Sequence, residues 1–164
     1  MAKENNAKEF FLLGKGAYIR CENVKYILDS ESKAAGQMLD KARATGARIV
    51  NLVGQKDKRL TVVTTFDGTL YLSGFKPSTI ADRLEKAGVK TIRVDTGTYL
   101  PRINILEVYG FDGTVATKLR KTCDPDSNVS LVRRTRKRKA TLRLKNGELV
   151  SVVCTPSKIA ESED

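Results

Sequence analysis

Residues 50–82, "VNLVGQKDKRLTVVTTFDGTLYLSGFKPSTIAD", decide the fold because the chain repeats them in outline. Residues 129–161 read "VSLVRRTRKRKATLRLKNGELVSVVCTPSKIAE", and 11 of the 33 ungapped positions are identical. Asp67-Gly68 is matched by Asn146-Gly147, so the turn residues agree as well. A chance likeness between short strands is the simplest alternative, but the shared turn and the shared Pro-Ser-x-Ile-Ala ending favour a duplicated unit.

The likeness continues upstream of these stretches, more weakly. "GKGAYIRCENVKYI" at 14–27 parallels "DTGTYLPRINILEV" at 95–108, which pairs Gly16 with Gly97, Tyr18 with Tyr99 and Asn23 with Asn104. We therefore expect two copies of one unit, at residues 9–88 and 90–161, followed by an acidic tail at 162–164.

The first unit has the pattern of short strands, one main helix, a hairpin and a short second helix. Alternating apolar residues predict strands at 10–13, 17–20, 24–28, 48–53, 59–66 and 69–73. Asp67-Gly68 between the last two favours a type I′ turn. One helical face carries Ala35, Met38, Leu39 and Ala42. Gly46 is a typical C-terminal stop for that helix. A second helix is expected to begin at Pro77 and to run to residue 87.

The second unit copies this order. Strands are expected at 92–94, 104–109, 129–132, 140–144 and 148–153, with a helix at 114–123. The fold class is therefore α+β: two tandem copies of a small sheet or barrel-like unit, each with one main helix and a short C-terminal helix.

The charge of the chain limits its function. A net charge of +11 and the absence of histidine favour a polyanion as partner and remove the commonest general base and metal ligand. Three scattered cysteines fit reduced thiols better than a disulfide framework or a zinc site. We expect no enzyme activity, no cofactor, no metal and no membrane partner. With no apolar run of membrane-spanning length, a cytoplasmic protein is expected.

The most concentrated charge lies at residues 133–139, where six of seven residues are basic. Further along, Ala140, Leu142 and Leu144 form one apolar strand face. The other face is Lys139, Thr141, Arg143 and Lys145, which we expect to meet solvent or a polyanion. A solvated guard of a sheet edge is the alternative, but that task needs only one or two lysines. If four to six of these groups neutralise phosphates, binding to duplex DNA should fall with salt at a log–log slope of about −4 to −5.

Motifs of the first unit resemble a known family. They are Gly14-x-Gly16 after a short strand, Glu31-Ser32 opening a helix, Ala42-Arg43-x-x-Gly46, and "LSGFKPSTIADRL" at 72–84. Together and in this order, over residues 9–85, they resemble the bacterial extracellular-matrix regulator RemA family. The resemblance implies a DNA-binding transcription regulator that assembles into a ring and wraps duplex DNA around its rim.

In that family an arginine pair in a Gly-Arg-Arg-Thr-Arg loop contacts DNA, and the resemblance places this role on Arg133 and Arg134 of the second unit. The first unit has Gly54-Gln55-Lys56 there, and a further family arginine falls at Asn23. The expected nucleic-acid-binding residues are Arg133, Arg134, Arg136, Lys137, Arg138, Lys139, Arg143, Lys56, Lys58 and Arg59.

Two functions remain open from the sequence. The first is a ring-forming regulator or architectural factor that contacts the backbone of duplex DNA, with RNA as another possible polymer. The second is a structural subunit of a larger ring or particle, of the phage portal or tail type or a ribonucleoprotein, whose basic loops face nucleic acid or an acidic partner. The cell of origin is accordingly expected to be bacterial, or the protein phage-encoded.

Overall fold

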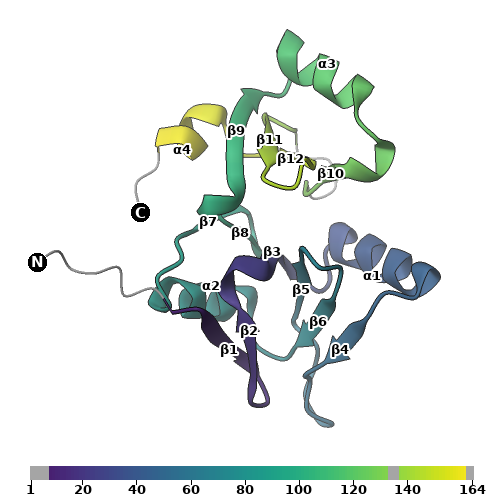
Figure 1. Ribbon diagram of the computed structural model, residues 1–164, viewed down its shortest axis with the longest axis vertical. Helices are drawn as coiled ribbons and strands as arrows, with labels where there is room; N and C mark the ends of the chain where they lie inside the picture. Colours follow the sequence, from purple (N-terminus) through teal and green to yellow (C-terminus); the bar gives the residue numbers. More distant parts are fainter. Residues whose placement is uncertain (1–7, 133–136, 162–164) are drawn as a thin grey trace, which may run out of the picture. The chain divides into compact units, whose positions relative to one another are not determined.

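A computed structural model describes residues 8–132 and 137–161 and shows a mixed α+β protein, as expected (Figure 1). Its contacts divide the chain into two compact units, which are described separately. Unit 1 holds residues 8–93 and Gly97–Arg102, and unit 2 holds Val94–Thr96 and the described residues from Ile103 onward. The expected tail at 162–164 lies outside the described residues.

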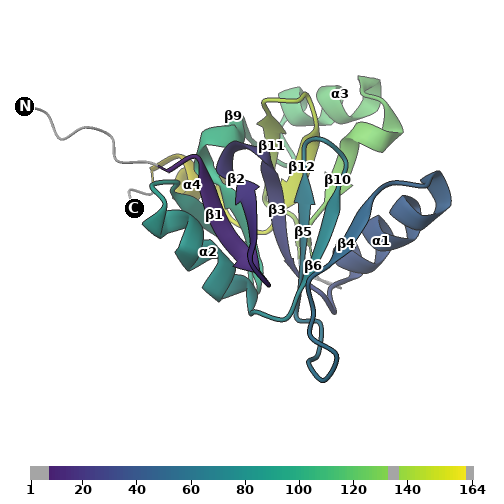
Figure 2. The same cartoon turned by 60° about the horizontal axis from the view of Figure 1, so that its bottom comes forward.

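Unit 1 is built on one open sheet with the strand order β4-β6-β5-β3-β8-β7, beside a separate hairpin, β1-β2. β4 runs parallel to β6, while β6, β5, β3 and β8 are antiparallel to their neighbours. The helices α1 and α2 lie to opposite sides of β3 and β5 (Figures 1 and 2). The elements are β1 (Phe10–Gly14), β2 (Ala17–Arg20), a 3-10 turn (Cys21–Asn23), β3 (Val24–Asp29), α1 (Lys33–Thr45), β4 (Ile49–Asn51), β5 (Thr61–Thr65), β6 (Leu70–Ser73), α2 (Pro77–Lys86), β7 (Thr91–Asp95) and β8 (Thr98–Pro101).

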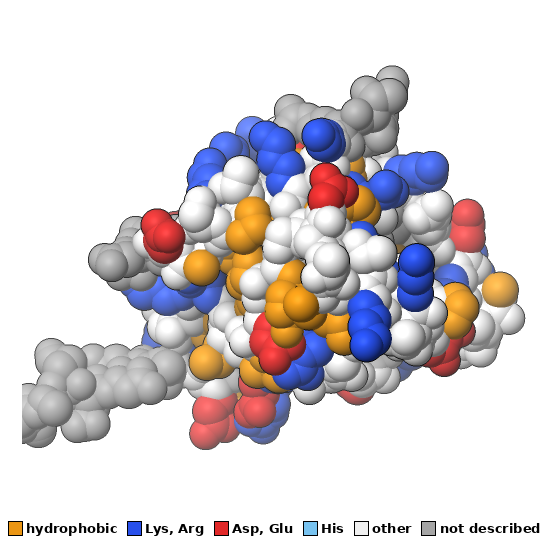
Figure 3. Space-filling model, turned by 90° about the horizontal axis from the view of Figure 1, so that it is seen from above, with side chains coloured by type: hydrophobic (Ala, Val, Ile, Leu, Met, Phe, Trp, Pro, Cys, Tyr) orange, Lys and Arg blue, Asp and Glu red, His pale blue; other side chains and the backbone are white. Residues whose placement is uncertain are grey.

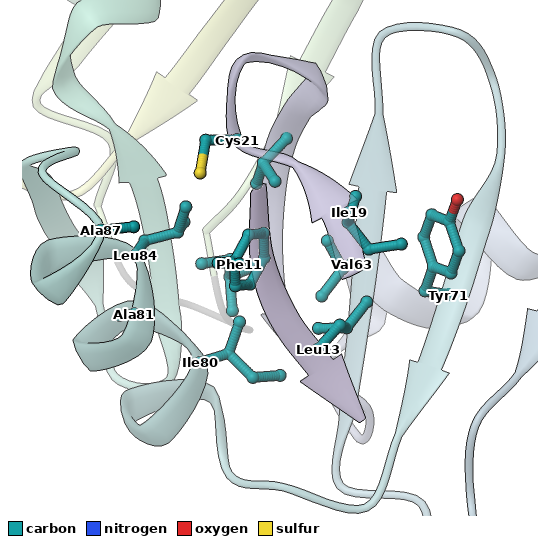
Figure 4. Close-up of a cluster of buried hydrophobic side chains, with 12 residues drawn as sticks. Phe11, Leu13, Ile19, Cys21, Val63, Tyr71, Ile80, Ala81, Leu84 and Ala87 are labelled. Carbon is teal, nitrogen blue, oxygen red and sulfur yellow. The ribbon is translucent and has the colours of Figure 1, made fainter. Parts of the chain in front are cut away.

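The core of unit 1 joins the β1–β2 hairpin, the sheet and α2. Leu13, Ile27, Ile80 and Leu84 are fully buried in one cluster (Figure 4). Burying an apolar side chain of this size stabilises the fold by about 1.5–3 kcal/mol. The cluster therefore holds the β1–β2 hairpin on the unit even though no strand pairs with it inside the described residues.

The main helix of unit 1 has the ends that its sequence predicts. Ser32 is its N-cap, and the Ser32 hydroxyl accepts a hydrogen bond from the Ala35 amide at 3.1 Å. Gly46 ends the helix in the left-handed conformation, with φ of 74°.

The turn between β5 and β6 differs from the prediction. A type I′ turn needs positive φ at both central residues, but among the described residues Gly68 has φ of 93° and Asp67 does not have a positive φ. Instead, the Asp67 carboxylate accepts hydrogen bonds from the Thr65 hydroxyl at 2.7 Å and the Thr69 amide at 3.0 Å. These bonds, the one from Thr65 first, lower the pKa of Asp67 to about 2. The type I′ prediction was wrong because the aspartate side chain supplies the turn's hydrogen bonds.

Unit 2 has the sheet order β10-β12-β11-β9, with β10 parallel to β12 and the other pairs antiparallel. The sequence prediction found the strands and helices of unit 2. It missed β8 of unit 1, whose short Thr-Tyr-Leu-Pro run has no alternation to mark it. The elements of unit 2 are a 3-10 turn (Arg102–Asn104), β9 (Ile105–Gly110), α3 (Thr114–Thr122), a 3-10 turn (Pro125–Ser127), β10 (Asn128–Ser130), β11 (Ala140–Leu144), β12 (Leu149–Val152) and α4 (Pro156–Glu161).

The two units repeat one topology and one strand register. The order β4-β6-β5-β3 in unit 1 recurs as β10-β12-β11-β9 in unit 2. Ile27 pairs with Val63 in the first sheet, and the residues at the corresponding places, Val108 and Leu142, pair in the second. The same correspondence of paired residues holds between β5 and β6 and between β11 and β12.

Candidate nucleic-acid interface

The basic segment of unit 2 is the connection between β10 and β11. Its described residues Lys137, Arg138 and Lys139 are exposed, and no strand or helix includes them. The predicted contact residues Arg133, Arg134 and Arg136 lie outside the described residues. We call residues 133–139 the basic loop.

Backbone hydrogen bonds fix both flanks of the basic loop to the sheet. On the β10 side, the Leu131 amide donates to the Ser151 carbonyl at 3.0 Å. On the β11 side, the Lys139 amide donates to the Val152 carbonyl at 2.9 Å, and the Phe111 amide donates to the Lys139 carbonyl at 3.1 Å. The backbone is therefore held to the sheet at Leu131, before the basic loop, and at Lys139, its last residue.

A ring and two guanidinium groups lie at the start of β11. The Arg120 guanidinium carbon is 3.7 Å from the centroid of the Phe111 ring, and that of Arg138 is 5.8 Å away. Arg120, which comes from α3, also donates to the Thr141 hydroxyl at 2.6 Å and to the Phe111 carbonyl at 2.8 Å. Arg138 reaches the Ser130 hydroxyl at 3.4 Å. Contact with an aromatic face restrains a guanidinium group at little cost in hydration.

Arg120 was missed by the sequence reasoning. One basic residue on an amphipathic helix looks like an ordinary solvated position, and only the packing of α3 beside β9 brings it to Phe111 and Thr141.

The polar face predicted for β11 is partly wrong. Ala140, Leu142 and Leu144 are fully buried, as predicted, and Lys139 and Lys145 are exposed. Thr141, however, is fully buried as well, because Arg120 covers it.

Arg143, the remaining member of that face, is held by an acid. Its Nε donates to Glu107 Oε1 at 2.6 Å, and the Tyr109 hydroxyl donates to the same oxygen at 2.5 Å. The bond from Arg143, followed by that from Tyr109, lowers the pKa of Glu107 to about 2, so the pair stays ionised at neutral pH. Arg143 therefore has a structural partner on β9.

The corresponding connection of unit 1, residues 53–59, carries one acid, Asp57, as well as three bases. A turn closes where the Asp57 amide donates to the Gly54 carbonyl at 3.0 Å, and Lys56 on this turn is exposed. Lys58 Nζ lies 3.3 Å from a carboxylate oxygen of Glu31. Arg59 is half-buried.

The two connections occupy corresponding places. In unit 1 the Leu60 amide donates to the Ser73 carbonyl and the Ser30 amide to the Leu60 carbonyl, as Lys139 and Phe111 do in unit 2. The described cations that the sequence predicted thus fall into one set in each unit: Lys56, Lys58 and Arg59 in unit 1, and Lys137, Arg138 and Lys139 of the basic loop in unit 2. Of the two connections, that of unit 1 contains an acid, Asp57, and that of unit 2 contains none.

Basic side chains are spread across the surface as well as concentrated at the basic loop. Figure 3 shows Lys and Arg side chains over much of the visible face, with Asp and Glu among them. Within residues 8–132 and 137–161, no group of three or more His, Cys, Asp or Glu side chains is arranged to hold a metal ion. No helix in those residues is long and apolar enough to cross a membrane.

Comparison with known protein families finds a match within unit 1. Residues 10–84 match the RemA-like family, described as extracellular matrix regulatory protein A-like. No curated protein matches the chain. The matched stretch begins at the first residue of β1 and ends within α2, so it covers the hairpin, the main helix and the β4-β6-β5-β3 part of the sheet. The resemblance to the RemA-like family that the motifs of unit 1 indicated is therefore confirmed over residues 10–84.

Proposed function

We propose that the protein is a non-enzymatic regulator or architectural factor that binds the phosphate backbone of duplex DNA through the basic loop of unit 2. The observation that carries this proposal is the placement of Lys137, Arg138 and Lys139. All three are exposed, and the backbone of Lys139 is hydrogen-bonded to Val152 and Phe111. Three further arginines precede them in the sequence, with no acid between them. Arginine and lysine side chains in this arrangement suit phosphate oxygens and give no sequence readout by themselves.

Duplex rather than single-stranded nucleic acid fits the aromatic residues of the site. Single-strand binders stack bases on exposed rings interleaved with cations. Arg138 of the basic loop lies 5.8 Å from the centroid of the Phe111 ring, and that ring is already in contact with Arg120 at 3.7 Å. The same backbone contact would be available to duplex RNA, so both polymers belong in the test.

The family match supports the regulatory part of the proposal and suggests an assembly. We further infer that the two units descend from one duplicated unit, since their strand order and paired residues correspond. The chain would then bring two family-like units to a homo-oligomeric ring, in which the basic loop of unit 2 is the main DNA contact and the unit 1 connection contributes less.

The test is a gel-shift titration of salt against affinity for a fixed DNA duplex. Each lost phosphate contact should reduce the magnitude of the log–log slope by about 0.9, so Arg133→Ala/Arg134→Ala should reduce it by about 2. The control Lys33→Ala/Arg48→Ala removes the same charge from two exposed positions, at the start of α1 and directly before β4, and should leave the slope nearly unchanged. Equal slopes for wild type and Arg133→Ala/Arg134→Ala would remove that pair from the interface. The same titration is run with a duplex RNA. A protein that assembles but binds neither duplex DNA nor duplex RNA would instead favour a structural subunit.

A further inference from the structure

Strand β3 of unit 1 is paired on both edges. β5 lies on one side, and β8 lies on the other, where Ile27 pairs with Tyr99 and Leu28 with Thr98. The Asp29 amide donates to the Gly97 carbonyl at 2.9 Å and extends this ladder. With both edges covered, Tyr26, Ile27 and Leu28 are fully buried.

Strand β9 occupies the corresponding place in unit 2 but is paired on one edge alone. It pairs with β11 in the register that β3 has with β5, and no strand of the described residues pairs with its other edge. Its residues are correspondingly more open: none of β9 is buried, and Leu106 is 53 % exposed. An apolar strand with an open edge is a template for another strand.

The hairpin β1–β2 is the element that corresponds to β7–β8. Both hairpins turn on a glycine with positive φ, Gly16 at 72° and Gly97 at 71°, and a 3-10 turn follows each of them. β8 adds to the sheet of unit 1, whereas β2 pairs with β1 alone within the described residues. Tyr18 on β2 is 64 % exposed, while Tyr99 at the same place on β8 packs against the core cluster of unit 1.

The chain therefore carries an open acceptor edge and an open donor edge, and its own β3–β8 pair shows how such edges fit. We propose that β2 of a second copy of the chain adds antiparallel to β9, as β8 adds to β3. Transferring the observed register pairs Val108 with the second copy's Tyr18 and Tyr109 with the second copy's Ala17.

The closest approach in the β3–β8 contact can be repeated between β9 and the β2 strand of a second copy without a steric clash. Gly97 lies against Asp29 so closely that a Cβ on Gly97 would come 3.0 Å from the Asp29 Cβ. At the corresponding places, Gly16 would meet Gly110 of the other chain, so both residues lack a side chain. A Cβ on either of these two glycines meets no atom within 4 Å in the single chain.

The contact is heterologous, because the donor strand and the acceptor strand differ. Each chain has one of each, so copies join head to tail and form a ring if the rotation closes and a filament if it does not. The inference rests on the homo-oligomer part of the proposed function and not on the DNA contact. It is a case of strand addition, in which main-chain hydrogen bonds supply the contact and the side chains of one face supply its specificity.

Disulfide cross-linking tests the register directly. In an antiparallel ladder, the Leu28–Thr98 pair lies between hydrogen-bonded pairs, because Asp29 bonds to Gly97. Side chains in such a pair are close enough for a disulfide. The matching positions between chains are Tyr109 and Ala17. The variant chain carries Ala17→Cys and Tyr109→Cys, with Cys21, Cys123 and Cys154 replaced by serine.

Under mild oxidation, we expect a ladder of covalent oligomers on a denaturing gel. Mixing a chain that carries only Ala17→Cys with one that carries only Tyr109→Cys should give a covalent dimer and nothing larger. A matched control replaces Ala17→Cys by Tyr18→Cys, which lies on the other face of β2 and should cross-link at least tenfold less. Absence of the ladder, or equal cross-linking by the control, would overturn the proposed register.

A second variant keeps the test independent of the cysteine-free background. By the β3 pattern, the Val108 amide faces the open edge and not β11, so Val108→Pro removes a donor from that edge alone. Light scattering should show Val108→Pro as a folded monomer while Val108→Ala still assembles. Assembly by a folded Val108→Pro would contradict the strand contact. A cross-linking chain that fails to bind DNA would count against the proposed function alone.

Discussion

At the scale of single residues, unit 2 separates cations that hold the fold from cations that are open to a partner. Arg120 of α3 donates a hydrogen bond to Thr141 of β11, and Arg143 of β11 donates one to Glu107 of β9, each at 2.6 Å. Lys137 and Lys139, in contrast, are exposed before β11. Basic side chains of unit 2 therefore serve two purposes, and the sequence pattern alone does not distinguish them.

The Glu107–Arg143 pair predicts a pH dependence of stability. The pKa of Glu107 is about 2 in the folded protein, whereas a glutamate in the unfolded chain titrates near pH 4.3. A lowered folded-state pKa means that the stabilisation is fully present above about pH 4.3 and is lost as the pH falls toward 2. The unfolding free energies of wild type and Glu107→Gln should thus differ by a constant amount above pH 5 and converge between pH 4 and pH 2.

Urea denaturation at a series of pH values measures this difference. In an Arg143→Met background, the same Glu107→Gln exchange should show a weaker dependence on pH, because the main hydrogen-bond donor to the carboxylate is absent. A wild-type difference that stays constant down to pH 2 would show that the ion pair does not form in solution.

At the scale of elements, the hairpins decide which strands pair. β7–β8 and β1–β2 share a length, a glycine turn and a following 3-10 turn, yet only the first joins the sheet of unit 1. Four of the six residues of β3 are buried, whereas none of the six residues of β9 is.

Alanine substitutions at the two turn glycines, Gly16 and Gly97, separate two losses of stability: the strain of a positive φ at the turn, and the steric conflict where β8 packs beside β3. Both Gly16 and Gly97 have positive φ, which costs an alanine about 1–2 kcal/mol. At Gly97 the new Cβ would also press on Asp29, where it lies 3.0 Å from the Asp29 Cβ. Gly97→Ala should therefore lower the unfolding free energy of the isolated chain by about 1 kcal/mol more than Gly16→Ala. Calorimetry of both variants measures this, and equal losses would show that β8 does not dock as described.

Much of the element order was predictable from the sequence, and the reasons are visible in particular stretches. The repeated Pro-Ser-x-Ile-Ala ending places both short helices, and Gly46 and Ser32 mark the ends of α1. The missed strand β8 depends on a partner, β3, that lies 70 residues earlier and that no local pattern names. The turn at Asp67 was missed because a side chain replaced the backbone geometry expected of Asp-Gly.

The sequence predicts where the basic residues of the candidate site lie along the chain, but not which side chains they contact. The run at 133–139 locates the basic loop, whereas the capture of Arg143 by Glu107 and of Thr141 by Arg120 arises from packing between elements. Burial of Thr141 follows from the position of α3, which a strand-by-strand reading of polar and apolar faces does not include.

At the scale of the whole molecule, two units with one topology carry different charge at the same place. The unit 1 connection has Asp57 within it and Glu31 beside Lys58, and the unit 2 connection has no acid. Counterion release scales with the number of phosphates that a protein neutralises, so the two connections should contribute unequally to DNA binding. The family match covers unit 1, while the proposed contact lies in unit 2.

The most direct measurement is therefore the salt dependence of binding to one labelled DNA duplex by fluorescence anisotropy, compared between the two connections. Lys137→Ala/Arg138→Ala/Lys139→Ala and Lys56→Ala/Lys58→Ala/Arg59→Ala remove equal charge from the two places. The first should reduce the magnitude of the log–log slope by about 2.7 and the second by less than about 1. Equal reductions, or a larger reduction from the unit 1 variant, would contradict the assignment of the DNA contact to unit 2.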